Sequence, residues 1–212
     1  MSVIEFPDAR ARDDFNTFVL RARKVRPLGD IRLQTVGPLL VMTVAVLEGT
    51  GLRGDGTVLG MRVVPAEASE PLDVTVTFAA VRDRLARADL SATSFPVPPT
   101  TVTVPWAALS PPRSGWEQVG SLSGSDIERI ADRGISTVAA GTPPGAGTHA
   151  VKALRQRVWG ELSDTEPAIP AGLAFAAHSL GFVAPGENVA VARHGDWDWI
   201  RLSTSRGHCL AR

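Results

Sequence analysis

Histidine and cysteine, the residue types that most often carry chemistry, are few and scattered in this chain. The four histidines show none of the usual metal-binding spacings, such as HxH or HExxH; they are His149, His178, His194 and His208. His208 and Cys209 are adjacent, so on a strand they project to opposite faces and cannot form a nucleophile–base pair. We therefore predict no metal, no cofactor and no local catalytic set. A set assembled from distant residues stays open, because such sets are spatial.

The glycine-rich segment 141–148, Gly-Thr-Pro-Pro-Gly-Ala-Gly-Thr, is the best candidate for ligand binding. It precedes a predicted helix, whose first backbone amides lack partners within the helix and could bind an anion. A phosphate-binding P-loop needs Gly-Lys at positions 146 and 147, where Ala146 and Gly147 stand. We therefore favour an ordinary connector between helices and keep an anion site as the alternative. The candidate anion-binding residues are Gly145, Gly147, Thr148 and Lys152.

The last segment, residues 188–212, has the pattern of a β-meander with apolar residues on both faces. Trp197, Trp199 and Arg201 occupy alternate positions, so a strand over 197–203 would place all three on one face. Tryptophan and arginine are enriched where proteins bind one another. The three residues are therefore candidate interface residues. An equally supported alternative is that this face packs against the N-terminal sheet of the same chain.

Hydrophobic periodicity predicts the elements of the N-terminal half. A helix over 8–25 places apolar residues at i, i+3, i+4 and i+7, with Asp8 as its cap. Strand patterns follow around 31–35, 39–47, 59–63 and 74–78, and helical spacing resumes from Phe78. Short connectors between the strands favour an antiparallel sheet.

A proline-rich segment over 96–113 divides the sequence into two regions, 1–95 and 114–212. It is either a linker or a crossover over a shared core. One edge strand is predicted inside it, over Thr101–Trp106, because Pro105 cannot donate to a central ladder. Since the apolar strand 39–47 needs cover on both faces, we expect at least one of the fragments 1–113 and 114–212 to be poorly structured alone.

The C-terminal region reads as three helices before the meander. A capping box at Ser125–Glu128 begins the first helix, which runs to about residue 140. The second and third helices are predicted over 148–159 and 171–180. The fold class is therefore α+β: an N-terminal helix with an antiparallel sheet, a proline-rich crossover, then three helices and a β-meander. This order also suits a winged-helix DNA-binding domain, but the third helix lacks base-reading side chains.

Composition narrows the functional classes. The formal net charge is zero, so the sequence gives no electrostatic reason to expect nucleic acid as a partner. A single cysteine and no apolar leader favour the cytoplasm. The longest apolar run, 39–47, is half of the ~20 residues that a membrane-spanning helix needs. Two lysines against twenty arginines indicate a GC-rich, bacterial coding sequence.

The leading hypothesis is a non-enzymatic, cytoplasmic binding or regulatory protein that acts through a protein interface, as a homo-oligomer or with another protein. The alternative is a small-molecule or anion-binding protein, or an enzyme, with its site at the glycine-rich loop 141–148. Its ligand is not identified by the sequence. A weaker alternative is a nucleic-acid-binding domain.

Overall fold

The computed structural model describes residues 2–50, 54–87, 92–184 and 186–212. Within these ranges it is a mixed α+β fold of five α-helices and antiparallel sheets, which confirms the predicted fold class. The chain divides into two compact units. Unit 1 comprises Met1–Val46 and Met61–Leu109, and unit 2 comprises Leu47–Gly60 and Ser110–Arg212.

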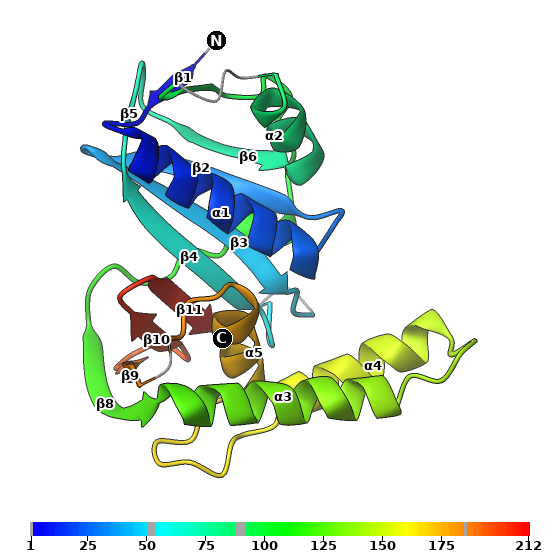
Figure 1. Ribbon diagram of the computed structural model, residues 1–212. Helices are drawn as coiled ribbons and strands as arrows, with labels where there is room; N and C mark the ends of the chain where they lie inside the picture. Colours follow the sequence, from blue (N-terminus) through cyan, green and yellow to red (C-terminus); the bar gives the residue numbers. More distant parts are fainter. Residues whose placement is uncertain (1, 51–53, 88–91, 185) are drawn as a thin grey trace. The chain divides into compact units, whose positions relative to one another are not determined.

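Unit 1 combines two helices with two antiparallel sheets, and in Figure 1 helix α1 lies across the larger sheet. The helices are α1 (Ala9–Val25) and α2 (Phe78–Leu85). The larger sheet has the order β6-β2-β3-β4, built from β2 (Asp30–Val36), β3 (Leu39–Leu47), β4 (Val58–Pro65) and β6 (Asp73–Thr77). The smaller sheet has the order β5-β1-β7, built from β1 (Val3–Glu5), β5 (Glu67–Ala68) and β7 (Ser94–Pro96). Leu47 of β3 and Val58–Gly60 of β4 belong to unit 2.

Helix α1 forms where its sequence pattern predicts it. The Asp8 carboxylate accepts a hydrogen bond of 2.8 Å from the Ala11 amide, which satisfies one of the free donors at the helix start. The ring of Phe15 lies 5.4 Å from that of Phe6 and 4.9 Å from that of Phe95, between ring centroids. The buried face of the helix thus supplies the core of unit 1; its large apolar members are Phe15, Phe18 and Val19.

The edge strand predicted over Thr101–Trp106 is wrong. Residues 101–104 are irregular, and Pro105 begins a short 3₁₀ helix, η1 (Pro105–Ala108). Proline has a fixed φ and no backbone N–H donor, and both properties suit the first helical position. Arg32 also holds this segment, since its guanidinium donates 2.8 Å hydrogen bonds to the Ala107 carbonyl and to both oxygens of Asp73. These hydrogen bonds with Arg32 lower the pKa of Asp73.

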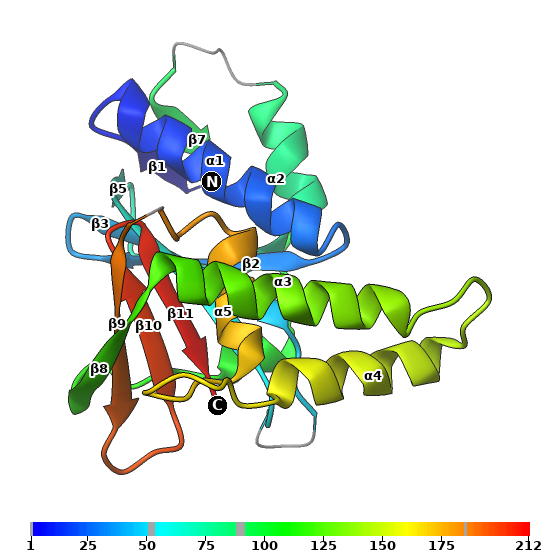
Figure 2. The same ribbon diagram turned by 60° about the horizontal axis from the view of Figure 1, so that its bottom comes forward.

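Unit 2 contains three helices and a four-stranded antiparallel sheet of order β11-β10-β9-β8 (Figure 2). The helices are α3 (Gly124–Ala140), α4 (Thr148–Gly160) and α5 (Ala171–Ser179). The strands are β8 (Trp116–Ser123), β9 (Asn188–His194), β10 (Ile200–Thr204) and β11 (Gly207–Ala211). Helix α3 contacts β8, and α5 contacts β10 and β11. The α3–α4 connector points away from the sheet.

The cap of α3 lies two residues before its predicted position. Ser123, not Ser125, is the N-cap, and its Oγ accepts a 3.1 Å hydrogen bond from the Asp126 amide. The same hydroxyl donates to the Asp126 carboxylate at 2.6 Å. Both serines are followed three residues later by an acid, so the sequence pattern alone fits two registers.

The three helices of unit 2 pack through small residues. Helix α5 is almost entirely buried, as its apolar sequence predicts. The Trp159 ring of α4 stacks on Phe175 of α5, with 4.3 Å between ring centroids. A Cβ atom at Gly134 of α3 would lie only 2.2 Å from Cζ3 of Trp159. Glycine at this position therefore makes room for the indole.

Candidate interaction surface

The strand register assigns each side chain of the unit 2 sheet to one of two faces. Residues that are paired across antiparallel strands project to the same face. Val191 pairs with Leu202, and Leu202 pairs with Cys209, so these three share a face. All three are buried. The loop between α4 and α5 lies on this side, because a Cβ atom at Gly120, which pairs with Val191, would contact Pro167. Burial raises the pKa of the Cys209 thiol, which keeps it protonated and unreactive.

The opposite face carries an aromatic and cationic cluster at the β8 side of the sheet. The guanidinium carbon of Arg201 lies 4.5 Å from the centroid of the Trp116 ring, within the range of a cation–π interaction. The His194 ring meets Trp116 edge-on, with 5.8 Å between ring centroids. The Trp116 indole is fixed by a 2.9 Å hydrogen bond from its Nε1 to the Pro112 carbonyl. We call Trp116, Gln118, His194 and Arg201 the β8 surface.

Arg201 has no anionic partner among the residues that the structure describes. Its Nε is buried and lacks a hydrogen bond, and no ion pair involves its guanidinium. Burial lowers the pKa of Arg201, because partial loss of water disfavours the charged form and no carboxylate compensates. Arg201 is thus half-buried, and its guanidinium contacts the Trp116 ring without a hydrogen bond or ion pair among the described residues.

The two C-terminal tryptophans occupy different environments. Strand β10 begins at Ile200, so the strand predicted over 197–203 is shorter than expected and Trp197 lies in the preceding turn. Trp199 is 3% exposed and Trp197 is 57% exposed. They therefore do not share a strand face. The candidate interface set of Trp197, Trp199 and Arg201 divides into an exposed indole, a buried one and a half-buried guanidinium.

Strand β8 lies at the edge of the unit 2 sheet, with β9 as its neighbour. The regular pairing with β9 is interrupted between Gln118 and Gly120 by a β-bulge. The intervening Val119 is 43% exposed, which makes it one of the few large apolar side chains at the surface of unit 2. A bulge and a glycine of φ 153° locally twist an edge strand, but they leave the rest of its outer edge available for pairing.

The glycine-rich loop 141–148 forms a connector between α3 and α4. Gly145, Gly147, Thr148 and Lys152 are all exposed, and Gly145 has a φ of 83°. Gly147 occupies the N-cap of α4, and no side chain caps this helix. The four candidate anion-binding residues thus lie on one exposed helix start. Their role in anion binding stays a prediction.

We expect inorganic phosphate to leave the melting temperature unchanged if the loop is an ordinary connector. A ligand at one hundred times its Kd would stabilise the fold by about 2.7 kcal/mol. Differential scanning fluorimetry with phosphate, with sodium chloride of equal ionic strength as the control, measures this. A saturable increase that disappears in a Thr148→Ala, Lys152→Ala double variant would establish an anion site.

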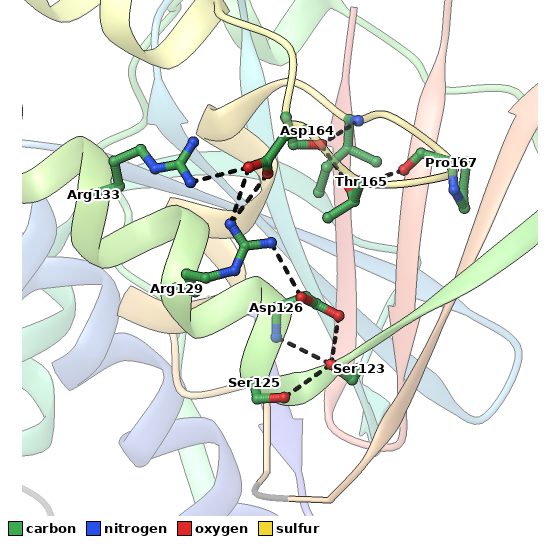
Figure 3. A network of polar contacts seen from close by, with 10 residues as sticks. Ser123, Ser125, Asp126, Arg129, Arg133, Asp164, Thr165 and Pro167 are labelled. Carbon is green, nitrogen blue, oxygen red and sulfur yellow. Dashed lines mark hydrogen bonds and ion pairs between the residues drawn. The ribbon is translucent and has the colours of Figure 1, made fainter.

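A polar network connects α3 with the loop that follows α4 (Figure 3). Arg129 bridges two carboxylates, with N···O distances of 3.1 Å to both Asp126 and Asp164. Arg133 forms a second ion pair of 3.1 Å with Asp164. Hydrogen bonds from the two arginines lower the pKa of Asp164 to about 2. The network holds the loop to α3, and its groups are solvent-exposed and already paired, so they offer little to a ligand.

Sequence reasoning missed the aromatic cluster around Arg201. Trp116 lies on β8, far from Arg201 along the chain, and no short motif connects it with Arg201 or with His194 of β9. In the described ranges, no group of three or more His, Cys, Asp or Glu side chains is placed to hold a metal ion. None of the helices that the structure describes is both long and apolar enough to cross a membrane.

Comparison with protein families separates the chain at the proline-rich segment. A family described as "Domain of unknown function (DUF8010)" matches residues 1–108, which is more than half of the chain. The chain belongs to the DUF8010 family. A second family, "Domain of unknown function (DUF8185)", matches residues 111–212 of this DUF8010 chain. No match was found among functionally curated proteins.

Among solved structures, the DUF8010 chain is similar to the DNA polymerase sliding clamp from Caulobacter crescentus. The TM-score is 0.51 at 11% sequence identity. The similarity covers 100% of this chain and 65% of the clamp chain, so this chain spans 65% of the clamp's length. At this level of identity the likeness shows a shared fold.

Proposed function

We propose that this chain is a non-enzymatic protein that acts through a protein interface, and that the β8 surface is part of this interface. The observation that carries the proposal is the half-buried Arg201, which lies on Trp116 of an edge strand and has no hydrogen-bond or ion-pair partner among the described residues. The fold supports the same class of function, since its structural neighbour is described as the sliding clamp of a DNA polymerase.

The residue types of the β8 surface favour a protein partner. Tryptophan and arginine are enriched among the few residues that contribute most of the binding energy at protein interfaces. An edge strand adds main-chain hydrogen bonds, because its outer N–H and C=O groups can pair with another strand. The same unit also exposes the indole of Trp197, between β9 and β10. The chain therefore has side-chain anchors and a main-chain template in the same unit.

The finer expectations from the sequence belong to this proposal as well. We propose a bacterial, cytoplasmic protein, with a homo-oligomer as one form that the interface could take. The division into regions 1–95 and 114–212 around a crossover over 96–113 likewise remains a proposal. Nucleic-acid binding is the weaker alternative, because the formal net charge is zero.

Site-specific photocrosslinking tests the proposed interface. A photoreactive benzoyl-phenylalanine replaces Val119 of the full chain, which is produced in the cells that express it naturally. We expect irradiation to give a discrete product of higher mass, identified by mass spectrometry as a complex with one protein. The matched control is Leu162, an apolar residue that is 67% exposed and lies outside the β8 surface. Equal products from the two positions, or none from Val119, would contradict the proposal.

A further inference from the structure

The Arg201 guanidinium has hydrogen-bonding capacity that the chain does not use. An arginine carries five N–H donors in a planar fork that matches a carboxylate in two-point geometry. Among the described residues none of these donors has a partner, and Nε is already withdrawn from solvent. The Trp116 ring holds the guanidinium plane from one side. A fixed fork loses less conformational entropy on binding than a mobile one.

We infer that the Trp116–Arg201 pair receives a carboxylate from an extended acidic segment of a partner protein, which pairs with the outer edge of β8. This inference rests on the proposed function and specifies the chemistry of the partner. The segment adds a strand beside β8 through main-chain hydrogen bonds, and an aspartate or glutamate side chain from it reaches the guanidinium.

The geometry places the guanidinium within reach of such a strand. The register sets Arg201 opposite Ala192, and Ala192 opposite Gln118, so the backbone of Arg201 lies two strands inward from β8. Its side chain nevertheless ends over the ring of Trp116, a β8 residue. A strand added to β8 lies ~4.8 Å beyond it. An acidic side chain on the same face can therefore span the remaining distance.

Charge favours an acidic segment over a basic one. The β8 surface contains the Arg201 guanidinium and no carboxylate. Glu117 is the acidic residue of strand β8. It pairs with Arg193, so its side chain projects to the face of the sheet opposite Arg201. Asp196 and Asp198 lie exposed in the β9–β10 turn, and neither forms an ion pair with Arg201. No carboxylate of the described chain neutralises the guanidinium.

Peptide display on the full chain tests the inference. A random library of twelve-residue peptides is selected against the wild-type protein, and the affinities of the selected peptides are measured by fluorescence anisotropy. We expect enrichment of peptides with Asp or Glu among β-branched residues. Arg201→Gln should weaken their binding by about 10-fold or more, since a charge-assisted two-point contact is lost. Arg201→Lys keeps the charge and should show an intermediate loss.

The control is Arg193→Gln, on the opposite face of the same sheet, which should change affinity less than 2-fold. Circular dichroism and a thermal melt confirm that each variant is folded. The inference is wrong if no peptide is enriched, if the enriched peptides lack carboxylates, or if Arg201→Gln binds them as tightly as the wild type. It is also wrong if inorganic phosphate or an oligonucleotide competes with the peptides better than a carboxylate does. A Val119 crosslink that persists in Arg201→Gln would overturn this inference alone, whereas absence of the crosslink from the wild type would overturn the proposed function.

Discussion

Trp199→Ala is expected to lower the melting temperature strongly without changing the molecular mass in solution. Trp199 is 3% exposed within the single chain, so its indole belongs to the core. Truncating a buried Trp to Ala costs about 3–5 kcal/mol, through lost burial and the cavity that remains. In a domain of this size that corresponds to roughly 6–20 °C. A thermal melt and multi-angle light scattering measure the two quantities.

Trp197→Ala is the matched control, because it removes the same side chain from a position that is 57% exposed. Surface substitutions usually change stability by no more than about 0.5 kcal/mol, so its melting temperature should stay close to the wild-type value. A folded Trp199→Ala protein with a lower mass and an unchanged melting temperature would instead place Trp199 in a contact between subunits. That result would support the interface role considered for this residue from the sequence.

Local patterns in the sequence were sufficient for most helices and strands. Phe15, Phe18 and Val19 specify the buried face of α1 by spacing alone, and α5 is recognisable from its apolar composition. Strands β1, β7 and β8 were not predicted. The three-residue strands β1 and β7 are too short for a period of two to be seen, and the apolar residues of β8 do not alternate. The α3 cap was misplaced because Ser123 and Ser125 fit the same rule.

Errors arose where distant residues decide the local structure. Thr101–Trp106 alternates like a strand, yet the Arg32 side chain holds the Ala107 carbonyl and favours a short helix instead. The cluster around Arg201 depends on strand order, which brings β8 beside β9 although three helices separate them in sequence. Single-residue patterns carry no information about such pairings. The sequence could therefore nominate Arg201 but not Trp116.

The division of the chain into units leads to the prediction with the largest structural effect. Unit 2 includes Leu47–Gly60, which residues of unit 1 separate along the chain from the rest of unit 2, Ser110–Arg212. The Gly56 amide donates a 2.8 Å hydrogen bond to the Arg212 carbonyl, and the Arg212 amide donates one of 3.2 Å to Thr57. A Cβ atom at Gly172 of α5 would lie 2.8 Å from Leu47 and 3.1 Å from Val58. The segment thus packs on α5 and pairs with the chain end.

A fragment of residues 110–212 is therefore expected to lack a cooperative unfolding transition, although a family match covers nearly all of it. It loses the apolar contacts of Leu47 and Val58 with α5, and it exposes the outer edge of β11 at Arg212. Urea unfolding followed by circular dichroism measures the transition. The matched control is a single protein in which a flexible glycine–serine linker joins residues 47–60 to residues 110–212. It should unfold in a single sigmoidal transition. Cooperative unfolding of 110–212 alone, at the same urea midpoint as the joined fragment, would mean that Leu47–Gly60 contributes no stability to unit 2.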